Sequence, residues 1–280
     1  MAAQTENGPV VASTTGPIVG HLRAAPPMEL VDDIATIDCK SVYYRYVNEA
    51  VRQAFEHGAT TVKLVNVMGQ RYIGTGLQGG EKRIEVYGTP GQDAAMFMDG
   101  PTLEVFGNAQ DGLGNTMSAG SIVVHGSAGD VLGYGMRGGR VFIAGDVGYR
   151  VGIHMKAREE LRPVVVCGGK ARDFFGEYMA GGLLVLLGMD SAFEGPLAGG
   201  YLGTGMHGVE IYLRGEIEPW RCGRDVTSAP ASDDEMAALA PVLADFCAAG
   251  GRDAAVVLSA GFTRIAPASS RPYNGRYVGL

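Results

Sequence analysis

Short apolar runs with a β-type pattern recur along the middle of the chain, and glycine-rich stretches separate them. Six segments share this layout, and each begins with a glycine: Gly88, Gly107, Gly126, Gly145, Gly169 and Gly188. They follow one another at intervals of 19 residues, except for one interval of 24 residues whose extra residues fit in the run 157–162. The runs that favour strands are 103–105, 122–124, 141–143, 165–167 and 184–186. The chain therefore contains repeated copies of one structural unit.

The same residue types return at the same position of these units. Methionines share the eleventh position: Met98, Met117, Met136, Met155 and Met179. Glycines share the eighth position: Gly114, Gly133, Gly152 and Gly176. A unit with one strand cannot bury its apolar face alone, so we expect the units to stack as a solenoid. The strand runs are also too closely spaced for helical crossovers between them.

The sequence therefore predicts a mainly β fold, a single-stranded parallel β-helix. Methionine and aliphatic columns should fill its interior, and glycines should lie at its corners. Looser copies of the unit at 66–87 and 200–214 bring the expectation to about seven coils at the strand spacing of stacked sheets.

The flanking segments are predicted to cover the two open ends of the β-helix. Residues 34–67 are typical of a strand, a helix from Ser41 to His57 and a second strand. Ser232 and Glu235 form a capping-box pattern at the start of a C-terminal helix that ends at Gly250. The expected division is a disordered tail at 1–27, an αβ cap at 28–65, the β-helix at 66–214, and a C-terminal helix with a partner-docking tail at 215–280.

Composition and charge exclude several classes of function. Glycine makes up 44 of 280 residues, but hydrophobic residues make up 46%, so a packed core is available. The net charge of −7 argues against a nucleic-acid or anionic-membrane surface. No apolar stretch approaches the roughly 20 residues that span a bilayer. The N-terminal 27 residues lack the basic start of a secretion signal.

The four cysteines are scattered without the paired spacing of zinc or iron–sulfur sites. Reduced thiols in a cytoplasmic protein are the expectation. Lone histidines such as His154 and His207 do not indicate a metal site.

Three segments match the glycine pattern of dinucleotide-binding loops, and they are 74–79, 133–138 and 203–208. Such a loop must follow a strand and begin a helix. Each match here continues into another β-type run instead. These glycines are therefore interpreted as corner residues of the β-helix.

Acidic residues fall near the expected corners: Asp111, Asp130, Asp173 and Glu177. Some β-helix enzymes use such groups to cleave acidic sugars. Their spacing does not select a general acid–base pair, and aspartate also suits solvated turns. A stand-alone carbohydrate-cleaving enzyme stays an alternative.

One polar and aromatic stretch precedes the longer interval between repeats. The candidate partner contacts in it are Tyr149, Arg150, His154 and Lys156, since insertions in solenoids tend to lie on the binding face. Arg150 could bind a carboxylate with two hydrogen bonds. The other interpretation is an outward surface between inward-facing Val151 and Met155. Two further candidate contacts, Arg271 and Tyr273, lie in the C-terminal tail.

The repeats at 126–139 and 169–182 resemble the GXGXG family. This family includes the C-terminal domain of the glutamate synthase large subunit and the related β-helix chain of formylmethanofuran dehydrogenase. The resemblance covers about 34–214 and is greatest to free-standing glutamate synthase domain-three subunits, as in N-methylglutamate synthase. The repeat around Thr102 lacks the glycine pair, and the last coil carries an insertion around 194–198, which leaves the coil boundaries open.

The resemblance implies a right-handed β-helix with no catalytic residue and no cofactor of its own. It implies a hetero-oligomer with a class II glutamine amidotransferase subunit, whose nucleophile is N-terminal. The second implied partner is an FMN-binding TIM-barrel synthase subunit that also holds an iron–sulfur cluster. The alternative is the equivalent scaffold in a formylmethanofuran dehydrogenase or formyltransferase/hydrolase complex of one-carbon metabolism.

Overall fold

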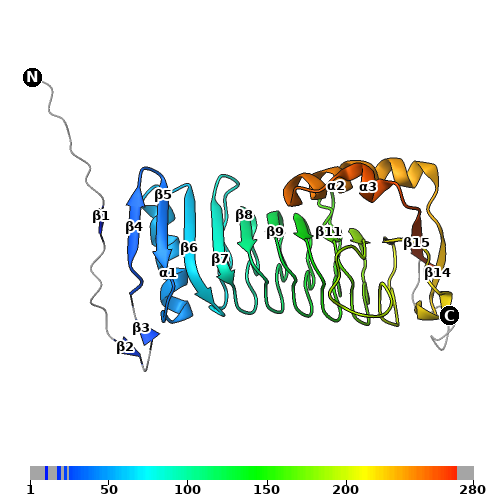
Figure 1. Cartoon of the computed structure of the whole chain (residues 1–280), viewed down its shortest axis with the longest axis horizontal. Helices are drawn as coiled ribbons and strands as arrows, with labels where there is room; N and C mark the ends of the chain where they lie inside the picture. The colour runs from blue at the N-terminus through cyan, green and yellow to red at the C-terminus, as the bar shows by residue number, and fades with distance from the viewer. Residues whose placement is uncertain (1–9, 12–17, 20–21, 24, 270–280) are drawn as a thin grey trace, which may run out of the picture.

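The computed structural model describes residues 10–11, 18–19, 22–23 and 25–269, and its strands lie side by side along the long axis of the molecule (Figure 1). The parallel strands are β5 (Ile34–Asp38), β6 (Thr61–Met68), β7 (Arg83–Thr89), β8 (Asp99–Phe106), β9 (Ala119–Val124), β10 (Arg140–Ile143), β11 (Val164–Cys167), β12 (Leu183–Leu186) and β13 (Glu210–Arg214). Each pairs with the next along the chain, and together with antiparallel strands at both ends they form a 13-stranded sheet. The predicted parallel β-solenoid is therefore confirmed.

The number of coils is slightly smaller than predicted. The solenoid makes about six turns, against the expected seven. The segment 66–87 has the same alternating positive φ at its corner, at Tyr72, Gly74 and Gly76, as the regular repeats. It begins within β6, which pairs with β7 through a register shift between Leu64 and Val67.

The predicted methionine column fills the interior. Its members are fully buried, and they are Met98, Met117, Met136, Met155 and Met179. Met206 extends the column into the last winding with 1% exposure. Removing one such side chain from water stabilises the fold by roughly 1.5–3 kcal/mol, so the column is a main part of the core.

Antiparallel strands cover both ends of the solenoid. At the N-terminal end β4 (Met28–Val31) pairs with β5, and β1 (Val10–Val11) pairs with β4. The short strands β2 (Ile18–Val19) and β3 (Leu22–Arg23) form a separate pair. At the C-terminal end β15 (Phe262–Pro267) pairs with β13 and with β14 (Val226–Pro230). A short 3-10 helix, η1 (Pro219–Arg221), precedes β14.

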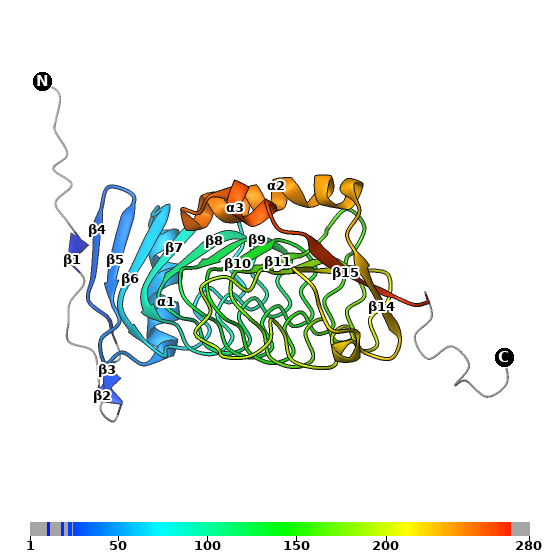
Figure 2. The ribbon, with the colours of Figure 1, turned by 45° about the vertical axis from the view of Figure 1, so that its right-hand side comes forward.

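The predicted helices are present, but the C-terminal one lies elsewhere than expected. Helix α1 (Tyr44–Glu56) connects β5 to β6. Helix α2 (Asp233–Gly250) begins at the predicted Ser232–Glu235 capping box. The expectation that α2 covers the end of the solenoid was wrong. With α3 (Ala254–Leu258), it lies along the outer face of the sheet (Figures 1 and 2), and β15 and β14 cover the end instead.

The position of α2 follows from the outward residues of the strands. One row of the sheet, in register from β6 to β13, reads Lys63, Glu85, Glu104, Val123, Phe142, Val166, Val185 and Tyr212. The row changes from charged to apolar at its middle. The apolar half packs with Leu239, Leu243 and Phe246 of α2 in a second hydrophobic core. The charged half stays uncovered by the helices because burying its charges would be costly.

Candidate interaction surfaces

The acidic residues proposed for sugar cleavage hold the windings together. The Asp111 carboxylate accepts a hydrogen bond from the backbone N–H of Asp130 at 2.9 Å. The Asp130 carboxylate accepts one from Tyr149 N–H at 2.9 Å, and Asp173 accepts one from Gly200 N–H at 2.8 Å. Each carboxylate thus satisfies a backbone donor on the next winding. This arrangement gives them a structural role and leaves the sugar-cleaving alternative without support.

Metal-binding side chains and cysteine thiols are the other groups that could carry chemistry. Among the residues that the structure describes, no three His, Cys, Asp or Glu side chains gather as a metal-binding group. Burial and the nearby Asp38 charge raise the pKa of the Cys39 thiol to about 12. Burial likewise raises the pKa of the Cys167 thiol. These thiols stay protonated at neutral pH and are poor nucleophiles.

The corners of the windings have an unusual backbone. In each winding, three alternate residues have positive φ, from Tyr72, Gly74 and Gly76 in the first corner to Tyr201, Gly203 and Gly205 in the last. The middle residue of each trio faces the core and is glycine at every corner except at Ala95. The first and third residues face outward, and they can carry side chains at a cost in strain.

Bulky residues occupy these strained positions on three consecutive windings. With the neighbouring Tyr134 they form a surface that we call the aromatic corner: Tyr134, Arg150, His154, Phe174, Tyr178 and Tyr201. Strained positions that keep large side chains are most often found at functional sites.

Two ladders of stacked groups run along the aromatic corner. In the first, the Arg150 guanidinium lies 4.3 Å from the centre of the Phe174 ring, and the Phe174 and Tyr201 rings stack at 4.9 Å. In the second, the His154 and Tyr178 rings stack at 5.4 Å. Tyr134 meets the His154 ring edge-on at 5.9 Å. The spacing follows from the repeat, which places equivalent residues one strand separation apart.

The structure places the predicted contact residues as follows. Arg150 and His154 belong to the aromatic corner, and the Arg150 guanidinium forms an ion pair with Glu177, whose side chain is buried. The carboxylate that Arg150 binds is therefore in its own chain. Tyr149 and Lys156 are exposed, while Val151 and Met155 are buried as predicted. The candidates Arg271 and Tyr273 lie outside the described residues.

The sequence prediction missed the other half of the aromatic corner. Phe174 and Tyr178 lie one winding beyond the predicted stretch, and Tyr201 lies two windings beyond it. The available signal was a bulky residue at an alternate position where other repeats carry glycine, as Tyr201 does in the series that contains Gly112. Such a residue must face outward, because the corner interior has room only for glycine or alanine.

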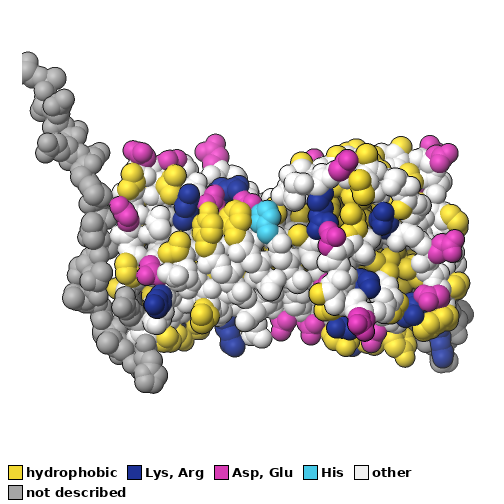
Figure 3. Space-filling model, in the orientation of Figure 1, with side chains coloured by type: hydrophobic (Ala, Val, Ile, Leu, Met, Phe, Trp, Pro, Cys, Tyr) yellow, Lys and Arg dark blue, Asp and Glu magenta, His cyan; other side chains and the backbone are white. Residues whose placement is uncertain are grey.

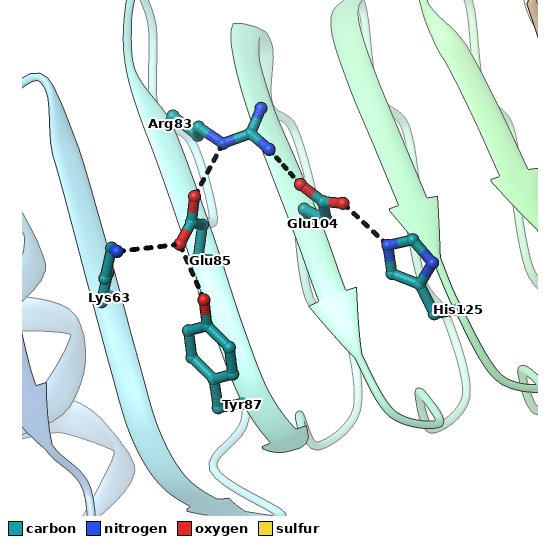
Figure 4. Close-up of polar contacts among 6 residues, drawn as sticks. All are labelled: Lys63, Arg83, Glu85, Tyr87, Glu104 and His125. Carbon is teal, nitrogen blue, oxygen red and sulfur yellow. Dashed lines mark hydrogen bonds and ion pairs between the residues drawn. The ribbon is translucent and has the colours of Figure 1, made fainter. Parts of the chain in front are cut away.

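A second candidate surface is the uncovered half of the sheet, which also was not predicted. Figure 4 shows its charged groups on β6, β7 and β8, with His125 following β9. The Glu85 carboxylate is 3.7 Å from Lys63 Nζ, 3.1 Å from Arg83 Nε and 3.0 Å from the Tyr87 hydroxyl. Arg83 also pairs with Glu104, whose other oxygen is 2.7 Å from His125 Nε2.

This network changes the acidity of its central carboxyl group. Partial burial alone would raise the pKa of Glu85, but hydrogen bonds from Tyr87 and Arg83 and the Lys63 charge outweigh it and lower that pKa. Beside the network, the rings of Tyr87, Phe106 and His125 stack at 4.8 and 4.9 Å. Figure 3 shows hydrophobic side chains in a row that ends at a histidine on this face.

Comparison with known proteins gives two matches. The family described as GXGXG motif matches residues 48–265. A protein of Methanocaldococcus jannaschii, described as uncharacterized, is 44% identical over 249 residues, which cover 86% of this chain and 95% of that protein. In the described part of the chain, no helix has both the length and the apolar character needed to cross a membrane.

Proposed function

The chain belongs to the GXGXG motif family, which is associated with glutamate synthase-like proteins, and we propose that it is a non-catalytic scaffold subunit of such a complex. On this proposal a class II glutamine amidotransferase subunit releases ammonia from glutamine. An FMN-binding TIM-barrel subunit with an iron–sulfur cluster completes the synthesis of glutamate or N-methylglutamate. This chain binds both and holds no cofactor itself. On this proposal the complex is cytoplasmic, and the four free cysteines of this chain stay reduced there.

One observation carries the proposal: the corner carboxylates are bound to backbone N–H groups, while strained aromatic residues stand exposed beside them. The corner carboxylates thus stabilise the fold. The exposed aromatic residues are of the types that contribute most of the binding energy in protein interfaces. A stack of hydrogen-bonded windings also loses little conformational entropy when partners bind to it. Both features suit a subunit that fixes the distance between two enzymes.

The test is purification of the tagged full chain from the cells in which it occurs. We expect an amidotransferase and a flavoprotein to co-purify in fixed stoichiometry, and the complex to consume glutamine. The chain alone should neither hydrolyse glutamine nor retain flavin. Stoichiometric flavin on the isolated chain would contradict the proposal. Co-purification of an amidohydrolase-like chain with a formyltransferase would replace it with the one-carbon scaffold.

A further inference from the structure

The second ring ladder of the aromatic corner stops one winding before the end of the solenoid. His154 and Tyr178 occupy the same position of successive windings, and their rings stack at 5.4 Å with planes 12° apart. The backbone N–H of Tyr178 donates to the carbonyl of Thr204 at 2.9 Å, which makes Gly205 the equivalent residue of the next winding. Gly205 has the same positive φ of 69° but no side chain. One face of the Tyr178 ring therefore has no ring above it.

A pocket of about 600 Å³ lies at this level. Its walls include Tyr178, Tyr201, Thr204, Trp220, Arg224 and Asp225. The Arg221 guanidinium lies 4.2 Å from the centre of the Trp220 ring and is itself paired with Glu218 at 2.6 Å, so this indole is held in place at the rim. Tyr178 thus lines the pocket together with two further aromatic side chains.

The exposure of the residues that line the pocket favours a polypeptide over a small molecule as its occupant. Trp220 is 72% exposed and Tyr201 is 59% exposed. A small-molecule site usually covers 70–90% of its ligand, which walls this exposed cannot do. A partner surface, in contrast, would cover the rim residues themselves. Tryptophan, tyrosine and arginine around a pocket are also the residue types that contribute most to protein–protein binding.

The charges beside the pocket indicate the character of the partner segment. Two residues after the ladder position, the windings carry Arg137, Lys156, Ala180 and His207 in turn. In the described part of the chain none of these side chains, nor Arg224 at the pocket, forms an ion pair. Asp225 is the one carboxylate among the pocket walls. Among the described residues, Arg224 in the pocket wall and Lys156 on the winding before Tyr178 are thus cations without an ion-pair partner, beside this single wall carboxylate.

We propose that this pocket binds an aromatic side chain from an acidic segment of a partner subunit, whose ring stacks on Tyr178 at the level of Gly205. Carboxylates that flank this ring face Lys156 and Arg224. The inference rests on the proposed scaffold function and adds to it the place of docking and the chemistry of the segment that docks.

The first test is crosslinking within the complex. A benzophenone amino acid replaces Trp220 in the tagged full chain, the complex is purified from the native cells and irradiated, and the crosslinked peptides are sequenced by mass spectrometry. We expect a crosslink to a co-purifying subunit, in a segment that contains an aromatic residue next to Asp or Glu. A crosslink to residues 270–280 of this chain, to a low-mass compound, or to a basic segment overturns the inference.

The second test measures how firmly the partner is retained. Gly205→Tyr adds a ring at the next position of the ladder, where φ is positive as it is at Tyr178, so that this ring competes with the partner's ring for Tyr178. Gly205→Tyr and Trp220→Ala are tested as separate variants, and each should lower retention of the partner on the tagged chain about tenfold. Phe97→Ala is the matched control, because Phe97 is an exposed aromatic residue at the same corner position of an earlier winding and belongs to neither candidate surface. Thermal unfolding of each variant checks that the solenoid is intact.

The outcomes separate this inference from the proposed function. If the wild-type chain co-purifies with no partner, the scaffold function itself is wrong. If Gly205→Tyr and Trp220→Ala retain the partner as well as the wild type does, the scaffold function stands and the docking site is elsewhere. Equal losses in Phe97→Ala and Trp220→Ala would also overturn the assignment of this pocket.

Discussion

The contact between Asp130 and Gly148 gives the sharpest test of how the windings are stacked. The Asp130 carboxylate accepts the Tyr149 N–H of the next winding at 2.9 Å. A Cβ atom at position 148 would overlap the same carboxylate oxygen and lie 2.9 Å from the Asp130 backbone nitrogen. Gly148 therefore cannot become alanine unless Asp130 leaves its hydrogen bond and the two windings separate.

The cost of Gly148→Ala can be worked out from these contacts. A hydrogen bond to a charged group contributes about 1.5–3 kcal/mol, and separating two packed windings adds to that loss. We expect the free energy of unfolding to fall by about 3 kcal/mol, measured by equilibrium denaturation in urea. Gly200→Ala is the control, since no atom lies within 4 Å of a Cβ placed there. Its effect should stay within about 0.5 kcal/mol.

A double-mutant cycle identifies the cause. Asp130→Ala alone should cost about 2 kcal/mol, because it leaves the Tyr149 N–H without its acceptor. In the Asp130→Ala background the carboxylate is gone, so Gly148→Ala should cost about 1 kcal/mol. The coupling of about 2 kcal/mol lies well outside the error of such cycles. Additive costs, or an equal loss in Gly200→Ala, would refute the stacking argument.

Two further predictions concern the core and the charged face. Met136→Ala removes a fully buried side chain and should lower the free energy of unfolding by about 2–5 kcal/mol. Met68→Ala, at 88% exposure, should change it by less than about 0.5 kcal/mol, and similar losses would contradict the methionine column. Because the pKa of Glu85 is lowered from 4.5, its ionised form stabilises the fold fully above that value and loses this effect as the pH falls through the lowered pKa. Denaturation at pH 7 and in acid should therefore show Glu85→Gln less stable than the wild type at pH 7, with a difference that shrinks as the pH falls below 4.5, and a difference that grows in acid would contradict the network.

The stacking of the windings could be predicted from the sequence, because equivalent residues of successive repeats lie next to one another in a solenoid. Met117 and Met136 are separated by one repeat, and in a solenoid that separation places them in neighbouring windings. The capping box at Ser232 and Glu235 is likewise local, since its donors and acceptors lie within one helical turn. Such features need no knowledge of how distant segments pack.

The position of α2 could not be predicted from the repeat period alone. It depends on how the outward residues differ from one strand to another. The runs 164–167 and 183–186 are apolar at every position, whereas 83–89 alternates between apolar and polar residues. An entirely apolar strand has both faces covered, so something must lie on its outer face. The repeats make the strands equivalent in position, but their outward residues decide which of them a helix can cover.

The aromatic corner raises the question of why strained positions keep large side chains. A residue other than glycine in the left-handed region costs roughly 1–2 kcal/mol, and glycine would avoid that cost at Arg150, His154, Phe174, Tyr178 and Tyr201. Ring stacking returns about 0.5–1.5 kcal/mol for each pair. Tyr201 is 59% exposed, so burial adds little to that return. Arg150 also pairs with the buried Glu177, which stabilises the chain itself. For Tyr201 the stability of the isolated chain gives no such reason, whereas a partner that covers it would gain the area it leaves exposed.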